Sequence, residues 1–125
     1  MTKITLLLGV FFCSFSVIMG AFGAHALKDN LSEYSMTVYN KAVLYQMFHA
    51  LGIILISILN QIFGTNELNL CSWLFIVGII LFSGSLFVLS ITGIKWLGAI
   101  TPMGGILFIV GWIVLFFKIL KLQVL

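Results

Sequence analysis

Charged side chains divide this sequence of 125 residues into four long segments that contain none. The charged residues are Lys3, Lys28, Asp29, Glu33, Lys41, Glu67, Lys95, Lys118 and Lys121. Between them lie residues 4–27, 42–66, 68–94 and 96–117, which are 24, 25, 27 and 22 residues long. Because a helix rises about 1.5 Å per residue, each segment is long enough to cross a hydrocarbon layer of about 30 Å. The sequence therefore predicts four membrane spans.

Composition excludes several classes of protein. Only 7% of the residues are charged, against about 25% in a typical soluble domain. Four spans with short connections use the whole chain, which leaves no room for a soluble catalytic domain. The formal charge of +3 comes from lysines scattered at the span ends, whereas a nucleic-acid interface needs them clustered on one face. We therefore expect the lipid bilayer as a partner and no nucleic acid.

The expected fold class is an all-α integral membrane protein. We place the spans at about residues 4–24, 40–63, 71–92 and 102–120, in a compact up-and-down bundle that forms a single membrane domain over residues 1–125. A short amphipathic helix is expected between the first two spans, because Asn30 and Glu33 resemble an N-cap with its reciprocal partner. Leu31, Tyr34 and Val38 follow at helical spacing.

Two further helix ends can be predicted. Gly93 is expected to end the third span in a left-handed conformation. Thr101 and Pro102 are expected to be the N-cap and first residue of the fourth span. The segment from Thr101 to Gly105 is interpreted as an ordinary helix start rather than as a re-entrant stretch lining a transport site.

Small residues recur at helical spacing in every predicted span. In lipid, helices associate where small side chains let two backbones approach closely. The spans are therefore interpreted as packed helices rather than lone anchors. The candidate packing residues are Gly9, Ser16, Gly20, Gly23, Gly78, Ser85, Gly104, Gly105 and Gly111.

A polar stripe in the second span provides candidate functional residues, namely Gln46, His49, Ser57 and Asn60. Such a stripe should face protein or water rather than lipid. His49 has two interpretations: a proton-relay or ligand group, or a neutral imidazole bonded to a facing carbonyl or hydroxyl. A single histidine without an intramembrane Asp or Glu makes a poor proton path, which favours the structural interpretation.

His25, at the end of the first span, is the remaining candidate functional residue. Haem ligation by His25 and His49 would need both at similar depth, and counting along the helices separates them by more than about 10 Å. A metal site lacks third and fourth ligands at suitable spacing, and Cys13 and Cys71 lie too far apart in depth for a disulfide. We therefore expect no cofactor and no metal.

No catalytic constellation is found in the sequence. Ser83 and Ser85 have no nearby acid and no nucleophile elbow, so they are interpreted as helix-packing hydroxyls. Lys3, the apolar stretch after it and the small residues around His25 imitate a signal peptide. The stretch is about 20 residues long and carries a packing stripe, so we expect it to be retained.

Charge gives little information on orientation. Three lysines fall on each side of the membrane when the four spans are threaded. A lysine before the first hydrophobic segment favours termini in the cytoplasm. Cytoplasmic termini and a plasma-membrane location are therefore expectations.

Four stretches resemble a known family in both order and spacing. They are Gly20-Ala-Phe-Gly-Ala-His-Ala-Leu27, Tyr45-Gln-Met-Phe-His-Ala-Leu51, Leu81-Phe-Ser-Gly-Ser-Leu86, and Leu97-Gly-Ala-Ile-Thr-Pro-Met-Gly-Gly105 with Gly111-Trp112. The chain thereby resembles the small four-span bacterial membrane proteins of domain-of-unknown-function family 423, which have mitochondrial relatives. The resemblance implies a multi-pass plasma-membrane protein of unassigned biochemistry and supplies no site residues.

Three functions remain as hypotheses. The favoured one is a non-enzymatic accessory or membrane-integrity protein that acts through helix packing, alone, as a homo-oligomer or in a larger membrane complex. The alternative is a small oligomeric transporter or channel that uses the polar stripe of the second span. An enzyme or redox subunit using His25 and His49 is disfavoured by the difference in their depths.

Overall fold

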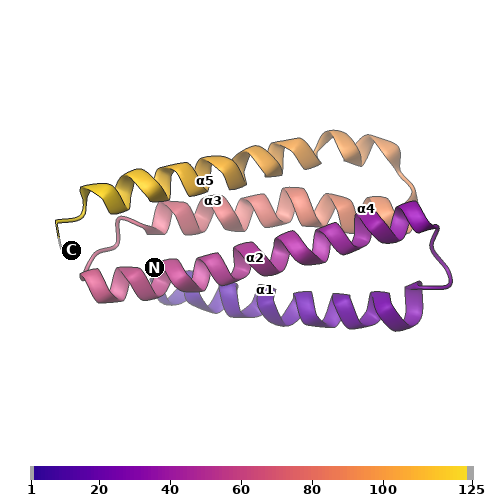
Figure 1. The fold of residues 1–125 in the computed structure, drawn as a ribbon, viewed down its shortest axis with the longest axis horizontal. Coiled ribbons are helices and arrows are strands. Elements are labelled where there is room, and N and C mark those ends of the chain that lie inside the picture. Colours follow the sequence, from indigo (N-terminus) through magenta and orange to yellow (C-terminus); the bar gives the residue numbers. More distant parts are fainter. Residues whose placement is uncertain (1, 124–125) are drawn as a thin grey trace.

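A computed structural model describes residues 2–123, and four long helical rods make up almost all of it (Figure 1). The first rod is α1 (Thr2–Phe22) with a π-helical turn (Gly23–Leu27), and the second is α2 (Glu33–Phe63). The third joins α3 (Asn69–Ile79), a second π-helical turn (Ile80–Gly84) and α4 (Ser85–Thr92). The fourth is a 3₁₀ turn (Lys95–Ala99) followed by α5 (Thr101–Lys121). All four are long and apolar enough to cross a membrane, so the predicted four-span, all-helical class is confirmed.

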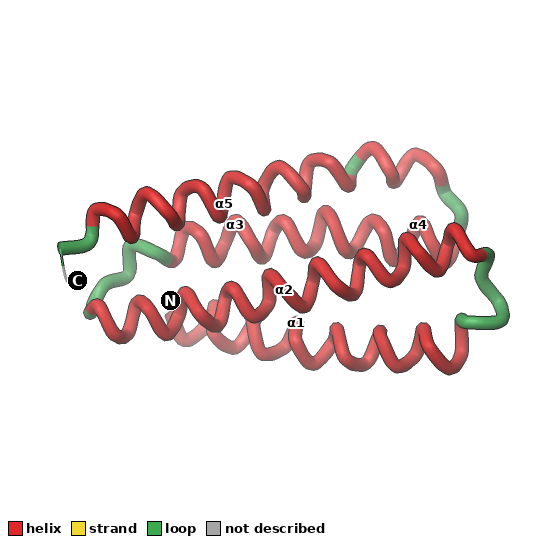
Figure 2. Tube along the Cα trace, in the orientation of Figure 1, coloured by secondary structure: helices red, strands yellow, loops and turns green. Residues whose placement is uncertain are grey.

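The rods run alternately up and down, joined by short loops (Figure 2). α1 packs on α2, α2 packs on α3 and α4, and α3 packs on α5. α1 and α5 therefore lie at opposite edges of the molecule (Figure 1). Only 17% and 22% of the most apolar stretches of the first and fourth rods are buried, against 44% and 50% for the two central rods. The two edge helices thus present broad apolar faces to the surroundings.

The prediction of a separate amphipathic helix before the second span is wrong. Residues 33–40 are instead the first two turns of α2, which continues to Phe63 over 31 residues. The helix begins after Ser32, whose hydroxyl accepts a hydrogen bond from the Ser35 amide at 3.1 Å, and no Gly or Pro interrupts its first turns. Asn30, the predicted N-cap, donates to the Ala26 carbonyl at 2.7 Å instead.

Two other predicted helix ends have different outcomes. Gly93 ends α4 in the left-handed region with φ of 72°, as predicted. Thr101 is not an N-cap, because α5 already begins at Thr101 and Ile100 precedes it. The Thr101 hydroxyl lies 2.7 Å from the Ser85 hydroxyl of α4. It thus links two helices rather than capping one.

Glycines bring α3 and α5 together. A Cβ added at Gly78 would lie 2.6 Å from the Phe108 ring, and one added at Gly111 would lie 2.5 Å from the Phe75 ring. A Cβ at Gly104 would overlap the backbone nitrogen of Phe82. These distances are shorter than van der Waals contact, so α5 can approach the third rod, α3 and the π-turn after it, this closely only with glycine at these places.

The other candidate packing residues differ in how tightly they are enclosed. Gly9 faces α2, with Ile54 3.0 Å from a built Cβ, and a Cβ at Gly23 would overlap the Tyr39 ring. Gly20 and Gly105 are in ordinary contact only, at 3.5 and 3.7 Å. Ser16 and Ser85 are buried, and each bonds a carbonyl of its own rod: Phe12 for Ser16 and Phe82 for Ser85.

Candidate functional site

His49 lies at the middle of α2, and both of its ring nitrogens are hydrogen-bonded. Nδ1 is 2.7 Å from the Tyr45 carbonyl oxygen, which can only accept, so Nδ1 carries the hydrogen. Nε2 then has a free lone pair, and the indole Nε1–H of Trp112 on α5 donates to it at 3.0 Å. An indole N–H can only donate. Both bonds therefore require the neutral tautomer that carries its hydrogen on Nδ1.

Aromatic rings from three helices enclose this imidazole. Phe108 of α5 stacks on it with ring centroids 3.6 Å apart. Phe75 of α3 meets it edge to face at 5.1 Å, and Tyr45 of α2 stacks at 6.2 Å. Protonation at Nε2 would break the bond from Trp112 and place a positive charge among these rings. The arrangement therefore favours a neutral structural histidine over a proton relay.

The rest of the polar stripe does not share a common cavity with His49. Gln46 donates from Nε2 to the Phe12 carbonyl of α1 at 3.0 Å. Ser57 donates to the Ile53 carbonyl of its own helix at 3.0 Å, and its hydroxyl lies 3.5 Å from that of Thr5 on α1. The stripe thus divides between α1 on one side and α5 on another.

Asn60 belongs to an amide cluster at the end of the molecule where the termini lie. Its Nδ2 donates to Oδ1 of Asn69 at 3.0 Å, and its Oδ1 accepts from the Leu68 amide at 3.3 Å. Asn69 donates to the Thr2 hydroxyl at 3.3 Å, and that hydroxyl donates to Asn66 at 2.9 Å. These bonds fasten the start of α1, the end of α2 and the start of α3. The cluster was not predicted, although Asn66 and Asn69 both lie in the short connection between the predicted second and third spans.

His25 lies far from His49 along the bundle. It is exposed in the π-helical turn that ends the first rod, whereas His49 is buried halfway along the second. Residues 2–123 contain no group of three or more His, Cys, Asp or Glu side chains placed to hold a metal ion. The two histidines are therefore not brought together as a ligand pair.

The first π-helical turn is part of a contact that the sequence analysis did not detect. The Tyr39 hydroxyl of α2 donates to the Met19 carbonyl at 2.5 Å, and the Tyr39 ring covers Gly23. Tyr39 is completely buried. A π-turn changes the backbone pairing of a helix, and here it accompanies a carbonyl that receives a bond from a neighbouring helix.

The second π-helical turn has a similar bond to α2. The hydroxyl of Ser83, which is fully buried, donates to the Ala42 carbonyl at 2.7 Å. Ser85, in the following turn, reaches Thr101. Both serines that could be mistaken for nucleophiles are thus bonded between helices.

Comparison with known proteins places the chain in a family. The model of the family "Protein of unknown function (DUF423)" matches residues 19–105. A UPF0382 membrane protein of Staphylococcus epidermidis is 46% identical over 121 residues, which cover 95% of this chain and 97% of the relative. A UPF0382 membrane protein of Staphylococcus haemolyticus has the same identity and coverage.

A more distant relative gives the same result. The UPF0382 membrane protein YwdK of Bacillus subtilis is 41% identical over 114 residues, covering 90% of this chain and 93% of the relative. No solved structure matches the chain significantly. The family match and the full-length relatives agree with the four apolar helices. The chain is therefore a membrane protein that belongs to the DUF423 family.

Proposed function

We propose that this protein is a non-enzymatic accessory or membrane-integrity protein that acts through its packed helices and their outer surfaces, and is not a pore. One observation carries the proposal. The polar side chains of the α2 stripe are bonded to different neighbours: Gln46 to α1, His49 to α5 and Asn60 to α3.

A transporter would need polar groups that line one continuous path for its substrate. The stripe of α2 points in three directions instead, and Gln46, His49, Ser57 and Asn60 are each at most 6% exposed. Interhelical hydrogen bonds of this kind hold a membrane bundle in one arrangement. The stripe is therefore better suited to fixing the fold than to conducting ions.

The outer surfaces are where such a protein would act. The edge helices α1 and α5 expose large apolar side chains along their whole length, among them Phe11, Val17, Ile109 and Phe116. These faces suit lipid tails, a second copy of the chain or a larger membrane complex. We therefore place any partner at the α1 or α5 edge.

The proposal can be tested in the native membrane. The tagged chain is purified in a mild detergent, and a deletion strain is assayed for leakage of a small dye across the membrane. We expect a co-purifying partner, a homo-oligomer or increased leakage that the restored gene reverses. Recovery of the monomer alone, together with unchanged leakage, would contradict the proposal.

Location and orientation are part of the same proposal. We place the protein in the plasma membrane with both termini in the cytoplasm, because Lys3 precedes the first hydrophobic segment. α1 starts and α5 ends at the same end of the bundle (Figure 1). Reporter fusions at Glu67 and after the last residue should then report cytoplasm, and a fusion at Asp29 should report the outside. The reverse pattern would contradict this orientation.

A further inference from the structure

A groove runs between α2 and α5 on the side of the molecule that α1 does not cover. Its walls are two stripes at helical spacing, and its floor is the inner face of α4 with the π-turn before it. It comprises three adjoining open pockets of about 590, 440 and 370 Å³. One wall is formed by Tyr34, Val38, Lys41, Tyr45 and His49 of α2. The other is formed by Gly98 of the 3₁₀ turn and by Thr101, Gly105, Ile109 and Trp112 of α5.

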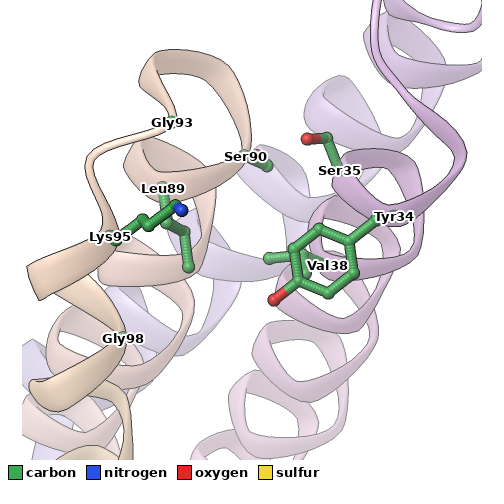
Figure 3. A pocket seen from close by; sticks show the side chains of 8 residues that line it. All are labelled: Tyr34, Ser35, Val38, Leu89, Ser90, Gly93, Lys95 and Gly98. Atoms are coloured by element: carbon green, nitrogen blue, oxygen red, sulfur yellow. The ribbon is translucent and has the colours of Figure 1, made fainter.

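The upper end of this groove is polar and basic. It lies at the end of the bundle opposite the termini, where Tyr34, Ser35, Ser90 and Lys95 line the first pocket. Figure 3 shows the Lys95 chain and the Tyr34 ring extending toward each other from opposite walls. Lys41 lines the second pocket, which lies closer to the middle of the bundle. Two cationic side chains thus line the upper half of the groove.

No carboxylate counters these lysines within the groove. Asp29 and Glu33 lie at the same end of the bundle but line none of the three pockets. Neither Lys41 nor Lys95 forms an ion pair with another residue of the range 2–123. The groove is therefore complementary to an anion.

The lower half of the groove is apolar and ends at the middle of the membrane. Phe82 and Leu86 form its floor, and Tyr45, Gly105 and Ile109 form its walls. The hydrogen bond between Trp112 and His49 closes it. At about 1.5 Å per residue, the groove extends about 22 Å from Tyr34 and about 12 Å from Lys41 to His49. One leaflet of the hydrocarbon core is about 15 Å thick, so these lengths match a lipid headgroup with one acyl chain.

We propose that this groove is a binding site for an anionic phospholipid, with the phosphate between Lys95 and Lys41 and one acyl chain along Phe82 toward Trp112. The contact between lysines and phosphate supplies headgroup selectivity, and the apolar half requires a lipid rather than a soluble phosphate. With the termini in the cytoplasm, the lipid belongs to the outer leaflet. The site goes beyond the proposed function, which concerns partners and leakage and does not depend on a bound lipid.

The test measures lipid retained by the purified full-length protein. Native mass spectrometry compares titrations with dioleoyl phosphatidylglycerol and dioleoyl phosphatidylcholine in one detergent. We expect one phosphatidylglycerol to be retained in preference to phosphatidylcholine. Lys41→Gln and Lys95→Gln should each weaken phosphatidylglycerol binding about fivefold, in line with the attraction of one basic side chain to an anionic surface.

A pair of control lysines separates a site from general surface charge. Lys118 and Lys121 lie at the other end of the bundle, in a pocket that also contains the Glu67 carboxylate. The double variant Lys118→Gln/Lys121→Gln removes the same charge as Lys41→Gln/Lys95→Gln and should leave the tightly held lipid in place. Equal losses in the two double variants, or equal retention of the two lipids, would overturn the proposal.

A steric variant tests the groove without changing charge. A Cβ built at Gly98 meets only Leu89, at 4.0 Å, so Gly98→Leu fits the fold and fills the upper groove. Gly84→Leu is its control, because nothing lies within 4 Å of a Cβ there and Gly84 lines none of the three pockets. Gly98→Leu should reduce phosphatidylglycerol binding at least tenfold and Gly84→Leu should not, with thermal unfolding reporting that both fold.

A soluble competitor distinguishes the lipid from its phosphate. Glycerol phosphate at millimolar concentration should leave phosphatidylglycerol bound, because it has no chain to fill the apolar half. Displacement by glycerol phosphate, or unchanged binding in Gly98→Leu, would overturn the lipid assignment. Either result would leave the partner and leakage measurements of the proposed function unaffected.

Discussion

At the scale of single residues, His49 illustrates what the sequence can and cannot predict. An imidazole in the middle of an apolar helix predicts a buried polar group that needs partners. The identity of those partners depends on which residues of α3 and α5 come opposite, and no pattern in α2 contains that information. Trp112 is 63 residues away in the chain, so its bond to His49 could only be found in the structure.

Trp112→Phe tests this bond directly. The variant keeps an aromatic ring but leaves Nε2 of His49 without a donor, so we expect a loss of about 0.6 to 1.7 kcal/mol in stability, as for other interhelical hydrogen bonds in membranes. The measurement is thermal or denaturant unfolding in one detergent. Trp96→Phe is the matched control, because Trp96 is 66% exposed. Equal stability of the two variants would rule out a structural role for the bond.

Two buried serines should respond in opposite ways to loss of the hydroxyl. Ser83 donates to Ala42 across the helix interface, so Ser83→Ala should reduce stability by about 1 kcal/mol. Ser72 is also fully buried, but its hydroxyl has no hydrogen-bond partner among the described residues. Ser72→Ala removes an unsatisfied group and should be neutral or stabilising. The measurement is the unfolding midpoint of each variant in the same detergent. A larger loss of stability in Ser72→Ala than in Ser83→Ala would contradict the hydrogen-bond assignment.

At the scale of elements, the spans were predictable because each is a long charge-free run. The beginning of α2 was not predictable. By composition residues 33–40 resemble a separate interfacial helix, and they would be helical both as such a helix and as the first turns of α2. The two π-helical turns have no sequence signal of their own. Each lies at a contact with α2, through Tyr39 for the first turn and Ser83 for the second, and tertiary contacts of this kind override local patterns.

Two neighbouring glycines of α5 provide a test of how closely this helix packs on the third rod. Gly104 and Gly105 are equivalent packing candidates by sequence, yet a Cβ at Gly104 would overlap the Phe82 backbone, whereas one at Gly105 lies 3.7 Å from the Phe82 ring. Gly104→Ala should therefore destabilise the protein by about 1 to 3 kcal/mol. Gly105→Ala should be neutral or gain up to about 1 kcal/mol from higher helix propensity. Unfolding in detergent compares them, and equal effects would mean that the close approach is not required.

At the scale of the whole molecule, the sequence predicts four packed helices but not their order in space. Small residues occur on all four spans, so they do not reveal that α1 and α5 lie at opposite edges. That arrangement places α2 at the centre, where its polar residues can bond to three other helices. It also leaves the groove between α2 and α5, whose two walls are separated by 48 residues of sequence, residues 50–97.

The central claim is that the intramembrane polar residues hold the bundle together and do not form a conducting path. Its most direct test is proton and potassium flux into liposomes that contain the purified protein, compared with empty liposomes and with His49→Leu. The account predicts that wild-type protein gives no flux above the empty liposomes, because the polar groups of α2 are bonded to separate helices. Flux that wild-type protein supports and His49→Leu abolishes would contradict it.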